Sequence, residues 1–282
     1  MSAILELFGH DTRSTKRKAW EDIISRQLCP FTKRRCYKVR KSQPGISIGT
    51  CSVGYGKECG PILICPNRFL ERRQIFVDSL HLLTRHEPGN QLHLVPEVPV
   101  PGGSVDYFLV SVRNDKPVDF VGIEIQTLDT TGTVWPARER FLRDMGFACD
   151  TAATESRKPF GMNWKMTAKT ILVQLHHKVD TFEHLSRHLV VVVQDCLFDY
   201  MKTEFSFSHL NQARAGDAMH FHTYGLERKG ASYAIRLDGR MSTDSAGIST
   251  ALGLQAKAKI DLDIILNNLE RKISPATLFQ PV

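Results

Sequence analysis

Residues 104–128 read SVDYFLVSVRNDKPVDFVGIEIQTL, and this stretch decides the fold. Two β-rich runs flank the turn-forming sequence NDKP, so they are predicted to pair as neighbouring strands. Side chains alternate along a strand, which puts Ile123 and Ile125 on one face of the second run and Glu124 and Gln126 on the other. A carboxylate and an amide in so apolar a strand indicate either a solvated sheet edge or a metal site built on a rigid strand.

The chain around this stretch shows the order helix, strand, strand, strand, helix, strand. These elements are predicted over residues 68–83, 91–100, 104–113, 118–128, 163–182 and 188–195. This order predicts an α/β fold with a mixed central sheet.

The remaining pattern predicts three parts of the chain. They are an N-terminal helical segment (1–28), an irregular cysteine-rich module (29–67) and one α/β domain (68–282). Helices are expected over 15–28, around 137–146, after 195 and over 250–273, with a hairpin within 221–239.

The bulk composition indicates a globular protein of the cytoplasm. No apolar run approaches the ~20 residues that a membrane span needs, and the start of the chain lacks the order of a signal peptide. The chain has seven cysteines, an odd number, so disulfides are not expected in a cytoplasmic protein.

Positive charge gathers near the N-terminus. The net charge is +7, and residues 1–85 hold 16 Lys/Arg against 7 Asp/Glu. Residues 31–41, FTKRRCYKVRK, have six cations and no acid. Such a surplus indicates a polyanionic partner or a solvated loop, and charge alone does not distinguish nucleic acid from an acidic membrane surface. The six candidate contacts are Lys33, Arg34, Arg35, Lys38, Arg40 and Lys41.

Acidic side chains are predicted to meet on the three strands. Asp106 lies in the second strand and can share a face with Glu124 and Gln126, while Glu97 can approach from the first. Buried carboxylates repel each other and need a cation, and oxygen ligands with waters suit Mg²⁺. Mg²⁺ supports phosphodiester hydrolysis. The alternative is a solvated edge with Glu97 and Asp106 in turns.

Five of the seven cysteines fall within residues 29–65. The spacing Cys29-x6-Cys36-x14-Cys51-x13-Cys65 allows a tetrahedral four-thiolate site, but it lacks the CxxC pair of ordinary zinc ribbons. Spacing alone leaves a metal site and scattered thiols equally open.

The sequence resembles two nested groups of nucleases. An Asp followed by Glu-x-Gln on adjacent strands looks like the PD-(D/E)XK nuclease core, whose usual αβββαβ order matches the order above. More narrowly, the sequence is similar to the NotI restriction endonuclease family over about residues 20–195. The matching stretches are CPF (29–31), CPNR (65–68), SVDYFLV (104–110), GIEIQTLD (122–129) and GMNWKMTAKTILVQ (161–174).

The resemblance implies roles for particular residues. Asp106 and Glu124 would ligate Mg²⁺, and Gln126 would take the place that lysine holds in many relatives. Glu97 matches an additional acidic position if a gap is allowed before GGSVD. The family's iron-binding module implies Cys29, Cys36, Cys51 and Cys65 as ligands of one structural metal, with Cys59 as the spare; the thiols themselves suit iron or zinc equally.

The resemblance also implies a function. It predicts a type II restriction endonuclease of the prokaryotic cytoplasm, a homodimer that cuts double-stranded DNA at a palindromic, GC-rich site. Two other functions stay open from the residues. One is a non-catalytic nucleic-acid-binding protein with a structural metal. The other is a repair or mobile-element nuclease of the same core without site specificity.

Overall fold

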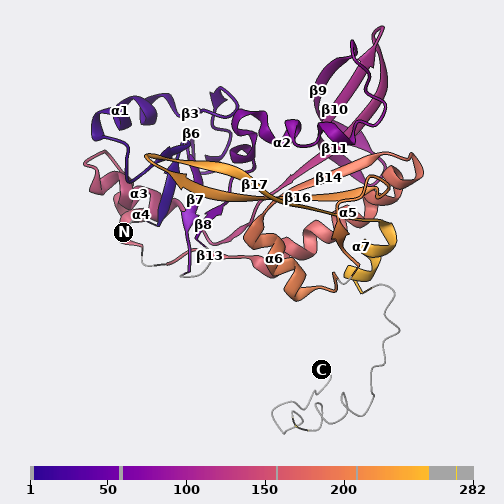
Figure 1. Ribbon diagram of the computed structural model, residues 1–282. Helices are drawn as coiled ribbons and strands as arrows, with labels where there is room; N and C mark the ends of the chain where they lie inside the picture. The colour runs from indigo at the N-terminus through magenta and orange to yellow at the C-terminus, as the bar shows by residue number, and fades with distance from the viewer. Residues whose placement is uncertain (1–2, 57–59, 157, 208, 254–270, 272–282) are drawn as a thin grey trace, which may run out of the picture.

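The computed structural model describes residues 3–56, 60–156, 158–207, 209–253 and 271. Most strands belong to a seven-stranded and a four-stranded sheet (Figure 1). In spatial order, the large sheet contains β15 (Asn211–Gln212), β17 (Ser232–Thr243), β16 (Met219–Lys229), β14 (His188–Gln194), β11 (Lys116–Gln126), β10 (Gly103–Arg113) and β9 (Gln91–Val100). The small sheet contains β2 (His10–Asp11), β1 (Ile4–Leu7), β7 (Thr50–Gly54) and β8 (Pro61–Leu63).

The remaining strands form two-stranded pairs. These pairs are β3 (Leu28–Cys29) with β4 (Arg34–Arg35), β5 (Val39–Arg40) with β6 (Gln43–Ser47), and β12 (Thr130–Thr131) with β13 (Gly161–Met162). The helices are α1 (Arg17–Arg26), η1 (Pro66–Arg73), α2 (Gln74–Val77), η2 (Leu80–Leu82), α3 (Trp135–Asp144), α4 (Thr151–Glu155), α5 (Trp164–His184), α6 (Asp195–Glu204) and α7 (Ser245–Ala251). In the part of the chain described, no helix has both the length and the apolar character to cross a membrane.

The central sheet is mixed, as predicted. β10 pairs antiparallel with both β9 and β11, whereas β11, β14 and β16 run parallel to one another. Parallel neighbours need a crossover, and the long helix α5 lies between β11 and β14 in the sequence. The predicted order of three strands, a long helix and a fourth strand is therefore confirmed.

Both faces of the sheet are covered near its centre. β14 is buried along its whole length, as its sequence HLVVVVQ requires of a central parallel strand. Figure 1 shows α5, α6 and α7 on one side of the sheet and α2 on the other. Ile123 and Ile125 pack in the apolar cluster with Phe76 of α2, so the opposite face of β11, which carries Glu124, is turned toward α5.

The cysteine-rich segment contributes to the small sheet and is continuous with the rest of the molecule. β7 and β8 pair with each other, and β7 also pairs with β1. The side chain of Gln194, at the end of β14, accepts from the Leu63 N–H at 2.8 Å and donates to the Pro61 carbonyl at 2.7 Å. One buried apolar cluster includes residues of both sheets, so the two sheets share a core.

Two predicted elements differ in the structure, and a third is mostly undescribed. The single helix predicted over 68–83 is wrong, because the chain breaks at Arg72 and Arg73, the last residues of η1, which have left-handed φ angles of 51° and 57°. Tertiary contacts set this break: buried Arg68 pairs with Glu6 at 3.0 Å and with Glu71 at 2.8 Å. The N-terminal segment is not purely helical, since it also forms β1 and β2. α7 ends at Ala251, and nearly all of the C-terminal helix predicted over 250–273 lies outside the described residues.

Candidate active site

The acidic residues of β9, β10 and β11 lie in one row across the sheet. Tyr107 pairs with Ile123 on one side and with Pro96 on the other. Continuing this antiparallel register by one residue sets Asp106 opposite both Glu124 and Glu97. Directly opposed residues share a face of the sheet, so the predicted meeting of Asp106 with Glu124 follows from the register.

Glu124 is held by a buried lysine. Its side chain is 5% exposed, and Lys178 Nζ of α5 lies 2.5 Å from Glu124 Oε1. Burial raises the pKa of Glu124 to about 7; the Lys178 hydrogen bond opposes this rise, and the charge of Asp106 adds to it. A carboxyl group in this state is poised to gain from a nearby cation.

Asp106 is tied to the neighbouring strand by its own side chain. Asp106 Oδ2 accepts a hydrogen bond of 2.8 Å from the backbone N–H of Ile125. Burial raises the pKa of Asp106, the Ile125 N–H and the charge of Lys178 lower it, and the charge of Glu97 raises it further. The two carboxylates are thus fixed by separate partners, so each keeps one oxygen not engaged by the lysine or the amide.

Gln126 and Glu97 occupy the margins of this row. Gln126 is the last residue of β11, half-buried, and lies on the same face as Glu124. Glu97 is exposed on the edge strand β9 and has a left-handed φ of 52°, so its side chain departs from regular strand alternation. Its charge nevertheless acts on Asp106. The structure therefore brings Asp106, Glu124 and Gln126 together, with Glu97 at the rim.

Lys178 was not predicted from the sequence, although its helix was. α5 buries Ile171, Leu175, Val179 and Phe182 on one stripe, and Lys178 falls within that stripe. A lysine at a core position of an amphipathic helix needs a buried partner, and this was the available signal. The partner could not be known without the packing of α5 on β10 and β11.

Of the four predicted cysteine ligands, Cys29, Cys51 and Cys65 are buried and Cys36 is half-buried. The thiols of Cys51 and Cys65 hydrogen-bond to each other, which raises the pKa of Cys51 and lowers that of Cys65 to about 7. Burial raises the pKa of Cys36, and negative charge at Cys65 and Cys29 raises it further. Cys59, the predicted spare, lies outside the described residues.

Metal-binding chemistry differs between these two groups. Within the described ranges, no three or more His, Cys, Asp or Glu side chains are gathered as a ready-made metal site. The Asp106–Glu124 pair suits Mg²⁺, because Mg²⁺ keeps several waters and often takes only one or two protein carboxylates. The four thiols have the donor chemistry for tetrahedral iron or zinc, and Cys51 and Cys65 are the two that already touch.

The predicted basic contacts fall into two groups. Lys33, Arg34 and Lys41 are exposed. The other three are engaged by the protein itself: Arg35, although it is also exposed, donates to the Gly45 carbonyl, and Lys38 Nζ donates to the Ile64 carbonyl at 2.6 Å. The charge of Lys38 also helps to lower the pKa of Cys65, after the Cys51 hydrogen bond.

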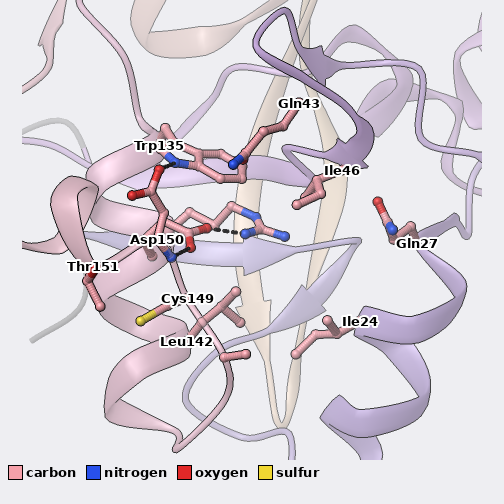
Figure 2. Close-up of a pocket in the computed structure, with 12 residues that line it drawn as sticks. Ile24, Gln27, Gln43, Ile46, Trp135, Leu142, Cys149, Asp150 and Thr151 are labelled. Carbon is pink, nitrogen blue, oxygen red and sulfur yellow. Dashed lines mark hydrogen bonds and ion pairs between the residues drawn. The ribbon is translucent and has the colours of Figure 1, made fainter.

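Arg40 lies beside a pocket rather than in open solvent. Figure 2 shows this pocket, of about 530 Å³, lined by Trp135 and Asp150 among others. The Arg40 guanidinium pairs with Asp150 at 2.5 Å and lies 4.9 Å from the centroid of the Trp135 ring. None of the acidic residues on β9 to β11 lines this pocket.

The fold and the site define an α/β protein whose mixed central sheet carries paired, half-buried to buried carboxylates on adjacent strands. The sequence model of the family described as "Restriction endonuclease NotI" matches residues 17–234. The chain therefore belongs to the NotI restriction endonuclease family, and membership implies an enzyme that cuts DNA. A comparison with curated proteins gave no match.

Proposed function

We propose that the protein is a type II restriction endonuclease that hydrolyses phosphodiester bonds of double-stranded DNA with Mg²⁺. The observation that carries this proposal is the opposition of Asp106 and Glu124 on neighbouring strands, both with pKa values raised first by burial. We assign β9, β10, β11, α5 and β14 to the PD-(D/E)XK core, since their order and strand directions fit it.

Asp106 and Glu124 would hold the ion, each through the oxygen that its protein partner leaves available. A Mg²⁺ ion held there would lower the pKa of a bound water and balance charge on the phosphoryl group. Gln126 is neutral and does not titrate near pH 7, so its amide would orient the attacking water rather than accept its proton. Glu97 at the rim would add negative charge beside Asp106.

The cysteine-rich segment would carry DNA contacts. Cys29, Cys36, Cys51 and Cys65 would bind one structural iron or zinc and hold the basic loops in place. Lys33, Arg34 and Lys41 have exposed side chains for phosphates. Arg35, Lys38 and Arg40, already engaged by the protein, would serve mainly to shape the segment. A palindromic, GC-rich site would be read by a homodimer of matching symmetry.

Digestion of a sequenced plasmid tests this function. With Mg²⁺ the wild-type protein should give a fixed set of fragments with uniform ends, and EDTA should stop the reaction. Asp106→Ala and Glu124→Ala should each lower the cleavage rate by about three orders of magnitude, because several kcal/mol of charge stabilisation are lost, while DNA binding persists. Asp180→Ala, an exposed carboxylate of α5, is the matched control.

Other outcomes would assign other functions. Cleavage near the wild-type rate in Glu124→Ala would remove the acidic pair from the reaction. Binding without any cleavage would indicate a non-catalytic DNA-binding protein. Heterogeneous fragment ends would indicate a nuclease without site specificity.

A further inference from the structure

Lys178 is a lysine in the protein core, with a side chain that is 7% exposed. Its ammonium group lies 2.5 Å from Glu124 Oε1 and donates to the Ser104 carbonyl at 2.6 Å. A lysine loses hydration when it is buried, so it remains charged only where partners replace the water. Glu124 and Ser104 are these partners, and both belong to the strands of the acidic site.

The backbone before β10 is shaped to receive this lysine. Gly102 and Gly103 have left-handed φ angles of 90° and 136°. A Cβ on Gly102 would lie 2.3 Å from the His177 carbonyl oxygen, and one on Gly103 would lie 3.3 Å from Lys178 Cε. The two glycines therefore let the start of β10 press directly on α5, which brings the Ser104 carbonyl to the ammonium.

Lys178 acts on both carboxylates of the pair. Its charge opposes the rise in pKa that burial causes in Asp106 and in Glu124. The neighbouring position on the strand face, Gln126, brings no charge. When Asp106 and Glu124 are both ionised, the pair and Lys178 together carry one negative charge, whereas the pair alone would carry two.

We propose that Lys178 is the resident counter-ion of the Asp106–Glu124 pair and sets the affinity of this pair for a divalent cation. The inference rests on the proposed function, because it takes the pair as the cation site. A cation that enters the site meets one negative charge fewer than it would without Lys178, and it must share Glu124 with the ammonium. In return, the loaded site is one charge more positive toward the phosphodiester anion than it would be without Lys178.

The inference predicts that removing the charge tightens cation binding. Lys178→Met and Lys178→Gln should each bind Mn²⁺ at least about tenfold more tightly than the wild type, since a unit positive charge within a few ångströms is lost. In EDTA both variants should unfold at a lower temperature, and Mn²⁺ should raise this temperature by more than it does for the wild type. Mn²⁺ accepts the same oxygen ligands as Mg²⁺ and is counted by its electron paramagnetic resonance without DNA or turnover.

Three comparison variants make the measurement decisive. Lys169→Met removes an exposed lysine from the same helix and should bind Mn²⁺ as the wild type does. Lys178→Arg keeps the charge and should stay within about threefold of the wild type. Glu124→Gln should lose binding if the pair is the cation site.

The outcomes separate this inference from the function on which it rests. Equal Mn²⁺ affinity in Lys178→Met, Lys178→Gln and wild type would overturn the role of Lys178, while loss of binding in Glu124→Gln would still support the cation site. If Lys178→Arg also bound Mn²⁺ more tightly, the tighter binding would come from altered packing and not from loss of the charge, and the proposed role of Lys178 would again be overturned. Unchanged binding in Glu124→Gln would instead overturn the proposed cation site.

Discussion

Gln126 has the least familiar side chain of the site. It ends β11 two residues after Glu124 and lies on the same face, half-buried. An amide donates through its nitrogen and accepts through its oxygen, but it carries no charge at any ordinary pH. Its proposed contribution is therefore one of geometry, and Lys178 supplies the positive charge that contacts Glu124.

The geometric role of Gln126 has a measurable consequence. Gln126→Ala should slow single-turnover cleavage about a hundredfold, the usual effect of a misplaced reactant, and leave DNA affinity close to that of the wild type. The control is Gln174→Ala, an exposed glutamine on α5. If Gln126→Ala cuts as fast as the control, the glutamine is only a polar neighbour at the end of the strand.

Residues of this site differ in how well the sequence predicts them. The shared face of Glu124 and Gln126 follows from strand alternation, and their meeting with Asp106 follows from the turn that joins β10 to β11. Lys178 lies 54 residues from Glu124 in the sequence. Its partner depends on how α5 is rotated and shifted over the sheet. The hydrophobic stripe fixes which face of α5 meets the sheet, but it leaves open how far the helix is shifted along its axis.

Elements with a strong hydrophobic period were predicted well, and those set by distant contacts were not. α5 buries most of one apolar stripe, and β14 is buried along its whole length. The sequence of each element is therefore enough to predict it. The segment 68–83 has a helical period too, but buried Arg68 must reach Glu6 and the Tyr233 carbonyl, 2.9 Å away. Satisfying that guanidinium outweighs helix propensity at Arg72 and Arg73.

The cysteine-rich segment is the element whose stability should depend on a metal. Purified protein should contain about one iron or zinc per chain. Cys65→Ser removes the hydrogen-bond partner of Cys51 and a proposed ligand, so the metal should be lost together with several kcal/mol of stability. Elemental analysis and thermal unfolding measure both effects, with Cys149→Ser as the control outside the segment.

The position of Cys59 provides a second check on this set. Cys59→Ser should retain the metal. If Cys59→Ser loses the metal and Cys65→Ser keeps it, Cys59 is a ligand in place of Cys65.

At the scale of the whole molecule, buried histidines make folding depend on pH. Burial lowers the pKa of His220 to about 4 and that of His222 to about 3, from an ordinary value of 6.5, and other histidines and Arg240 add to the effect. Both ring nitrogens of His222 are buried without a hydrogen-bond partner among the described residues. The folded state therefore keeps these rings neutral, while the unfolded chain takes up protons below about pH 6.5.

This difference predicts loss of stability in mild acid. Above the unfolded pKa of about 6.5 these two histidines do not reduce the free energy of unfolding. As the pH falls toward 4, this free energy declines by up to about 1.4 kcal/mol per pH unit for each histidine. His222→Leu should flatten the dependence between pH 6 and pH 4.5, because it removes one proton site at similar volume. Denaturant unfolding across this range measures the slope, and exposed His184→Leu is the control. Equal slopes in both variants would place the acid sensitivity elsewhere.

The α/β class and the mixed central sheet were predictable because the hydrophobic runs of β10, β11, α5 and β14 are long and regular. The small sheet was not, since β1 and β2 are four and two residues long and the sheet forms only when β1 pairs with the distant strand β7. Strands this short carry almost no periodic signal, and their pairing is decided by the common core.

The edge strand β9 has a consequence for how copies of the protein meet. A free edge of ten residues normally invites a strand of another molecule to continue the sheet. Here Pro96 and Pro99 lie three positions apart, so their missing N–H groups fall on opposite sides of the strand and one of them is missing from the free edge, while Glu97 turns the backbone into the left-handed region. The edge therefore protects the protein against sheet-to-sheet aggregation and leaves the acidic row open at its rim, the side from which the proposed substrate would approach.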